Sequence, residues 1–153
     1  MGYTNMYAPV MNRADYSRPL LDDGLRDWLV RMNRSLPAMA IDEAILKLND
    51  FDSGSLLQKN IVFMDYLQNG ITVKYAVKGE ERSSVVKLID YADADKNYFY
   101  VVNQYTFVEN ENNRRPDIIL FINGLPLVLM ELKSPSKDEV GAENAYNQIR
   151  NYM

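Results

Sequence analysis

The sequence predicts an α+β domain in which a mixed β-sheet is flanked by helices. Three observations support this fold class: apolar residues recur at helical spacing up to Gln68, the period changes to two after Gly70, and helical composition returns after Ser136. Helices followed by strands and then by a helix are typical of an α+β fold. The 153 residues, 47% of them apolar, are enough for one domain with a sizeable core.

The first half of the chain is expected to contain three helices. They span residues 21–32, 37–48 and 55–68. In each, apolar residues three and four positions apart form one face, and Gly70 is placed to end the third helix. Residues 1–20, with Pro9 and Pro19, show no period. We therefore expect an extended N-terminal arm over residues 1–20 and a domain over residues 21–153.

The second half is expected to contain the sheet. The expected strands span residues 71–77, 85–91 and 98–109, followed by two apolar hairpin arms, 118–122 and 125–130, around Asn123-Gly124. A last helix is expected over residues 137–153. Its pattern stops without a capping glycine, so we expect the chain to be a fragment of a larger protein.

Composition limits the chemistry that the chain can perform. Cysteine and histidine are both absent, which excludes disulfides, thiolate nucleophiles, zinc sites built from these residues and a histidine base. Oxygen ligands remain, and they suit Mg²⁺ or Mn²⁺. The net charge of −4 argues mildly against a nucleic-acid partner, so local geometry or a larger assembly would have to supply the affinity for phosphates.

The sequence shows no signal for a membrane or for export. Its longest apolar run is far shorter than the ~20 residues that a membrane helix needs. The first residues lack a basic region leading into an apolar stretch, so we expect a cytoplasmic protein without a membrane partner. Glycine-rich nucleotide-binding motifs are also absent from the sequence.

Three charged residues stand at the ends of the two apolar hairpin arms: Asp117, Glu131 and Lys133. Charges at the margin of a hydrophobic sheet are costly to desolvate unless they bind a cation or pair with each other. A divalent-metal site for phosphodiester cleavage uses all three. The alternative is a structural one, in which Asp117 begins a strand and Glu131 and Lys133 form an edge ion pair that contributes only ~0–1 kcal/mol.

The metal-site hypothesis requires a hairpin register in which Asp117 and Glu131 project from the same face of the sheet. A strict two-residue turn at Asn123-Gly124 would place Asp117 opposite Met130, so that Asp117 and Glu131 would project from opposite faces. A three-residue loop with a bulge would shift the register by one and bring Asp117 onto the face of Glu131. We therefore predict an odd-length turn or a bulge in this hairpin.

On that register the two carboxylates can bind Mg²⁺, or Mn²⁺ in its place, and the backbone carbonyl of Leu132 can complete the protein ligands. Lys133 would orient the attacking water or stabilise the transition state.

These residues carry a family resemblance. Pro116-Asp117 followed by Glu131-Leu132-Lys133 resembles the PD-(D/E)xK nuclease motif. The stretch of residues 115–135 is similar to the N-terminal nuclease domain of the restriction (motor) subunit of type I restriction enzymes. Further similar segments are residues 67–73, 87–90 and 103–107, so the resemblance covers residues 22–153. It implies a restriction-endonuclease-like core for the domain at residues 21–153.

The resemblance also implies a function: a Mg²⁺-dependent endonuclease acting on double-stranded DNA. Specificity and methyltransferase subunits would join through the full-length chain and choose the site, and ATP would be used only by motor domains absent from these residues. Gln148 and Tyr152 match the family's Gln-x-x-x-Tyr signature, which by the resemblance helps to hold the DNA backbone. The alternative is that Tyr152 is a packing residue and Gln148 a solvated one. Arg114 and Arg115 could steer phosphate toward Asp117 or be solvated loop charges.

The sequence departs from the family pattern at its start. Family members begin with a helix that bears an acidic residue supporting the metal site, and no such helix precedes Met1-Gly2-Tyr3. Glu43 is a candidate substitute, although a solvent-facing helix residue would look the same. Two other functions therefore stay open: a catalytically silent docking or DNA-guiding module with a nuclease-like fold, and a free-standing nuclease that recognises branched DNA.

Overall fold

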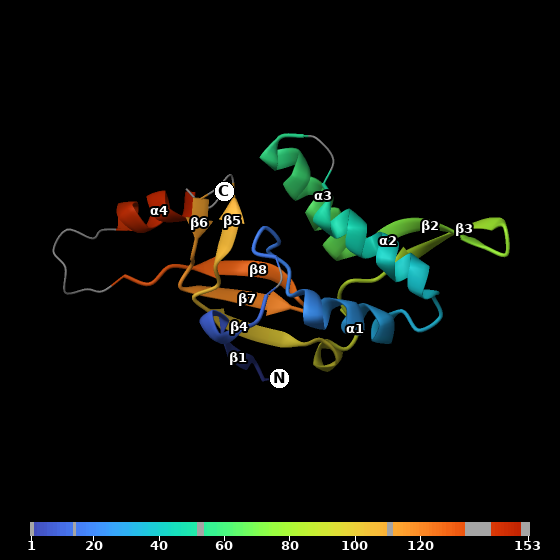
Figure 1. Cartoon of the computed structure of the whole chain (residues 1–153), viewed down its shortest axis with the longest axis horizontal. Coiled ribbons are helices and arrows are strands. Elements are labelled where there is room, and N and C mark those ends of the chain that lie inside the picture. The colour runs from blue at the N-terminus through green and yellow to red at the C-terminus, as the bar shows by residue number, and fades with distance from the viewer. Residues whose placement is uncertain (1, 14, 52–53, 110–111, 134–141, 151–153) are drawn as a thin grey trace. The chain divides into compact units, whose positions relative to one another are not determined.

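A computed structural model describes residues 2–13, 15–51, 54–109, 112–133 and 142–150. It confirms the α+β class, with four α-helices in the described part of the chain and a mixed four-stranded sheet. The chain divides into two compact units: Met1–Leu20 together with Tyr98–Met153, and Leu21–Asn97. The first of these units contains the mixed sheet (Figure 1).

The mixed sheet has the strand order β1-β4-β7-β8. Its strands are β1 (Thr4–Tyr7), β4 (Phe99–Asn103), β7 (Ile118–Ile122) and β8 (Leu125–Met130). The pairing of β1 with β4 is parallel and the other two pairings are antiparallel, which makes the sheet mixed. Residues 4–7 of the expected N-terminal arm thus form a strand of this sheet, and a 3₁₀ turn, η1 (Ala8–Val10), follows them.

The expected single strand over residues 98–109 is divided in two. β4 ends at Asn103, and β5 (Phe107–Glu109) pairs with β6 (Asn112–Arg114) in a separate ribbon. The division falls at Gln104, whose φ of 56° lies in the left-handed region. An extended strand cannot continue through a residue in that conformation, so the chain turns there.

Arg13 fixes the segment after η1 to the rest of this unit. Its guanidinium lies 4.0 Å from the centroid of the Tyr105 ring and 4.9 Å from that of Tyr16, and it donates to the backbone carbonyls of Thr106 and Arg18. Tyr105 is fully buried and packs edge-on against Phe121, with ring centroids 5.1 Å apart. Cation–π and aromatic contacts of this kind anchor a segment that has little regular structure.

The second unit holds the three expected helices. They are α1 (Asp22–Met32), α2 (Ala38–Asn49) and α3 (Leu56–Asn69). Ser55 and Gln58 form a capping box at the start of α3, and Gly70 ends it with a φ of 80°. A Cβ at Gly70 would lie 2.7 Å from the carbonyl oxygen of Val86, so the close passage of backbone here requires glycine.

The hairpin of this unit differs from the expected one. β2 (Ile71–Val77) agrees with the prediction, but its partner is β3 (Glu80–Val86) rather than residues 85–91, so that prediction was wrong. Lys78 and Gly79 both have positive φ, at 54° and 84°. Two such residues form the tight turn that suits a two-residue hairpin, and strand pairing resumes at once after them.

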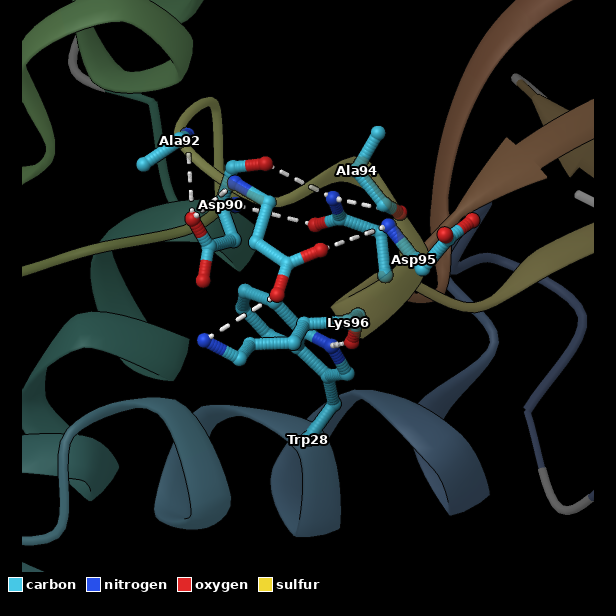
Figure 2. Close-up of polar contacts among 8 residues, drawn as sticks. Trp28, Asp90, Ala92, Ala94, Asp95 and Lys96 are labelled. Atoms are coloured by element: carbon cyan, nitrogen blue, oxygen red, sulfur yellow. Dashed lines mark hydrogen bonds and ion pairs between the residues drawn. The ribbon is translucent and has the colours of Figure 1, made fainter.

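Asp90–Asn97 forms a compact polar loop (Figure 2). The Asp90 carboxylate accepts hydrogen bonds from the backbone of Ala92 and Asp93, each at 3.0 Å. The Asn97 amide donates to the carbonyls of Asp90 and Ala94. Trp28 of α1 donates from Nε1 to the carbonyl of Lys96, at 3.2 Å, within the 3₁₀ turn η2 (Ala94–Lys96). The Asp93 carboxylate accepts from the backbone N–H of Asp95 at 3.3 Å, so the acidic side chains at 90 and 93 both close turns.

The last described helix is α4 (Ala142–Arg150), within the expected residues 137–153; the rest of that range lies outside the described residues. Among the described helices, none combines the length and apolar character needed to span a membrane.

Candidate active site

The β7–β8 hairpin contains the predicted bulge. Asn123 and Gly124 form a two-residue turn with φ of 56° and 89°, and Ile122 pairs with Leu125. The register then shifts, because Phe121 pairs with Pro126 but Leu120 pairs with Val128. Leu127 is therefore an extra residue on β8. The prediction of an odd-length turn or a bulge is confirmed as a bulge, placed within β8 rather than at the turn.

The bulge decides which residues face each other at the open end of the hairpin. Beyond it, Ile119 pairs with Leu129 and Ile118 pairs with Met130. The next residues outward on the same register are Asp117 and Glu131, and directly opposed residues project from the same face of a sheet. Both are half-buried, while Lys133 is exposed. This shifted register is the one that the predicted site requires.

Both oxygens of the Asp117 carboxylate are held by hydrogen bonds. Oδ1 accepts from the side-chain amide of Gln104 at 3.1 Å, and Oδ2 accepts from the backbone N–H of Leu132 at 2.8 Å. The backbone carbonyl of Asp117 also accepts from the N–H of Gln104, at 2.9 Å. Residues following β4 and β8 therefore fix the orientation of this carboxylate from its two sides.

Gln148 of α4 joins the other two charged residues. Its Nε2 donates to Oε2 of Glu131 at 3.0 Å, and its Oε1 accepts from the ammonium of Lys133. The amide of Gln148 thus bridges the two charged groups: its nitrogen donates to the carboxylate and its oxygen accepts from the ammonium. The structure brings together Asp117, Glu131, Leu132, Lys133 and Gln148, and Tyr152 lies outside the described residues.

The two predicted arginines lie just before this site in the chain. Arg114 is the last residue of β6 and is half-buried, and its Nε has no hydrogen-bond partner within the part of the chain that the structure describes. Arg115 is exposed, and the following Pro116 is buried. An arginine nitrogen that is inaccessible to water and has no such partner is a costly feature, which an anionic ligand could offset.

The predicted supporting acid lies in the other unit. Glu43 is on α2, half-buried, and lines a cavity of about 580 Å³ together with Lys47, Phe51 and Tyr66. Over the described residues, no group of three or more acidic, histidine or cysteine side chains is placed to hold a metal ion. The predicted site thus rests on two carboxylates, those of Asp117 and Glu131, without a third acidic side chain beside them among the described residues.

Gln104 is the residue that the sequence analysis missed. It belongs to the segment 103–107, which resembles the restriction-subunit family, but the apolar and aromatic residues around it predicted an unbroken strand. The available signal was a polar residue at the point where β4 leaves the sheet, across from Asp117.

Comparison with known proteins supports the resemblance seen in the sequence. The family model described as "Type I restriction enzyme R protein N terminus" matches residues 1–153. The type I restriction enzyme HindI endonuclease subunit of Haemophilus influenzae is 35% identical over 92% of this chain. The proposed type I restriction enzyme MjaIXP endonuclease subunit of Methanocaldococcus jannaschii is 30% identical over 84% of it.

The chain spans only a small part of these relatives, since each alignment covers 13% of the relative's length. The match of the family model runs over the whole sequence and includes every residue of the carboxylate site. The chain therefore belongs to the family of type I restriction enzyme R protein N termini.

Proposed function

We propose that this chain is the nuclease domain of a type I restriction enzyme subunit and hydrolyses phosphodiester bonds of double-stranded DNA in a Mg²⁺-dependent reaction. One observation carries the proposal: the extra residue Leu127 shifts the register so that Ile118 pairs with Met130, and Asp117 and Glu131 are the next residues outward on the two strands. A regular hairpin with the same turn would place Asp117 across from Met130. A structural ion pair between Glu131 and Lys133 alone would give no reason for this bulge.

The donor set at this site fits a hard divalent cation. Asp117 and Glu131 would hold Mg²⁺ or Mn²⁺, and the backbone carbonyl of Leu132 would be the third protein ligand. Mg²⁺ is commonly held in proteins by one or two carboxylates with water completing its shell, so a third acidic side chain is not required. When bound, the ion would lower the pKa of a water molecule and neutralise charge on the phosphate.

The residues around the carboxylates have distinct roles in this proposal. The exposed ammonium of Lys133 would stabilise negative charge that develops on the scissile phosphate. Gln148, bound to Lys133 and Glu131 at once, would hold the ammonium near the carboxylates. Asp117 is already fixed through both oxygens, so little reorganisation would be needed when substrate binds.

DNA binding would depend on local positive charge because the whole chain carries a net charge of −4. We place Arg114 and Arg115 on the phosphate backbone beside Asp117. Gln148 of α4 and Tyr152, which lies outside the described residues, would contact the same DNA strand. The relatives are named as endonuclease subunits. We infer that specificity and methyltransferase subunits select the DNA site and that ATP is used by motor domains elsewhere in the complete protein.

Replacing Lys133 with alanine tests this function in the complete protein, meaning this chain with all the domains and subunits that it has in the cell. DNA cleavage and ATP hydrolysis are measured separately on the same preparation. We expect cleavage to fall by about 10²–10³-fold, as for the loss of one group that stabilises transition-state charge, and ATP turnover to persist. Cleavage at the parent rate would remove Lys133 from the mechanism.

A further inference from the structure

Gln104 lies at the point where β4 turns away from the sheet. Its φ of 56° is unusual for a residue other than glycine, and the described residues with a side chain and positive φ are Lys78, Gln104 and Asn123. The other two belong to two-residue hairpin turns. Gln104 does not, so its conformation calls for another explanation.

The strand register provides that explanation. Asn103 pairs with Ile118 at the end of the β4–β7 ladder, so Gln104 and Asp117 are the next residues across from each other. In the left-handed conformation Gln104 donates twice to the same residue, from its backbone N–H to the Asp117 carbonyl and from Nε2 to Oδ1. The unusual backbone therefore aims a side-chain donor at one oxygen of the candidate metal ligand.

The second oxygen of Asp117 is held independently by the N–H of Leu132. With both oxygens bound, rotation of the carboxylate about its last torsion is restricted. Each oxygen still has a lone pair available for a cation, because a carboxylate offers about four acceptor positions and these two bonds use only two. Gln104 and Leu132 thus fix the orientation of the Asp117 carboxylate and leave acceptor positions on its oxygens for a cation.

We propose that Gln104 is a positioning residue, whose side-chain amide orients Asp117 for divalent-cation binding. This inference rests on the proposed nuclease function. The proposed role requires an amide donor at the end of a side chain as long as that of glutamine. Neither asparagine, whose amide is one carbon closer to the backbone, nor a residue without an amide should replace it. Loss of a group that orients a metal ligand typically reduces metal affinity or activity by about 10–100-fold.

The test uses Gln104→Gly in the complete protein. Glycine accepts a positive φ and removes the whole side chain, amide included, while the backbone conformation is kept, so the thermal midpoint should stay close to that of the parent. We expect Mn²⁺ affinity, measured by calorimetry in the absence of DNA, to fall about 10–100-fold, with a similar fall in cleavage. Gln104→Asn, which also tolerates this backbone but whose amide is one carbon shorter, should lose as much.

Lys78→Gly is the matched control. Lys78 has nearly the same φ, 54°, but is exposed in the turn between β2 and β3. The same relief of backbone strain at this position should leave Mn²⁺ affinity and cleavage at the parent level. Any effect specific to Gln104 then comes from its amide and not from the backbone.

The outcomes separate the two proposals. Parent-like Mn²⁺ affinity in both Gln104 variants, with Asp117→Ala unable to bind, would overturn the positioning role and leave the nuclease function standing. A large drop in the thermal midpoint of Gln104→Gly would also overturn it, by making the amide a structural group. If the parent itself took up no Mn²⁺, the nuclease function would fail with it, in favour of a docking or DNA-guiding module.

Discussion

At the scale of single residues, buried polar groups fix the local geometry on which the site depends. Asn123 is 1% exposed although it is a turn residue, because its N–H donates to the Tyr98 carbonyl and its Oδ1 accepts from the Tyr98 N–H, both at 2.8 Å. It thereby joins the turn of the β7–β8 hairpin to the start of β4. This link holds together one end of β4 and one end of β7. Gln104 and Asp117 lie beyond the opposite ends of these two strands.

Asn123→Ala should therefore destabilise the fold by about 2–3 kcal/mol, since a buried hydrogen bond is lost and alanine is disfavoured at positive φ. Asn123→Gly loses the bond but keeps the conformation, so it should cost only about 1 kcal/mol. Urea unfolding of the 153-residue chain, followed by circular dichroism, compares the two variants. Equal stabilities would show that the side-chain bond, and not the backbone conformation, accounts for the role of Asn123.

At the scale of elements, the β7–β8 hairpin was predictable in everything except the position of its irregularity. Asn123-Gly124 predicts the turn, and the need for a shift of one residue follows from the parity of Asp117 and Glu131. A glycine bulge at the turn and a bulge later in β8 produce the same shift. Leu127 lies among similar apolar residues, so no local preference identified it as the extra one.

The bulge leads to a prediction about two variants, one with a residue deleted from β8 and one with a residue inserted into it. Deleting Leu127 makes the ladder regular and still pairs Leu120 with Val128, so Asp117 stays across from Glu131 and cleavage by the complete protein should remain within about tenfold of the parent. Inserting one valine after Leu127 shifts the outer part of β8 by one residue and puts Met130, in place of Glu131, across from Asp117, so cleavage is expected to fall to the level of Asp117→Ala. An inactive but folded deletion variant would show that the bulge does more than set the register.

At the scale of the whole molecule, the sequence was most informative where structure is decided locally. The three helices of Leu21–Asn97 follow from spacing and caps, such as the Ser55–Gln58 capping box. The strand partner of β2 and the break at Gln104 were missed because each depends on a residue other than glycine with positive φ. Such residues pay a local cost that only contacts distant in sequence can offset, so a single sequence gives little sign of them.

The charge of the chain bears on the proposed function at this scale, because that function requires a polyanion to bind to a chain with a net charge of −4. Local arginines can solve it only if they meet phosphates directly, since each neutralised phosphate adds about 0.9 to the magnitude of the slope of log K against log salt for duplex DNA. Arg114, with its Nε lacking a hydrogen-bond partner among the described residues, and the exposed Arg115 are placed for this in the proposal.

Replacing both Arg114 and Arg115 with alanine should therefore lower the magnitude of this slope by about two, measured by titrating the complete protein onto duplex DNA at several salt concentrations. Lys74→Ala is the control, because Lys74 is exposed on β2 and paired with Glu81 at 3.2 Å. Its slope should match the parent. An unchanged slope in the double variant would mean that these arginines contact no phosphate, and that the affinity for DNA comes from another part of the complete protein.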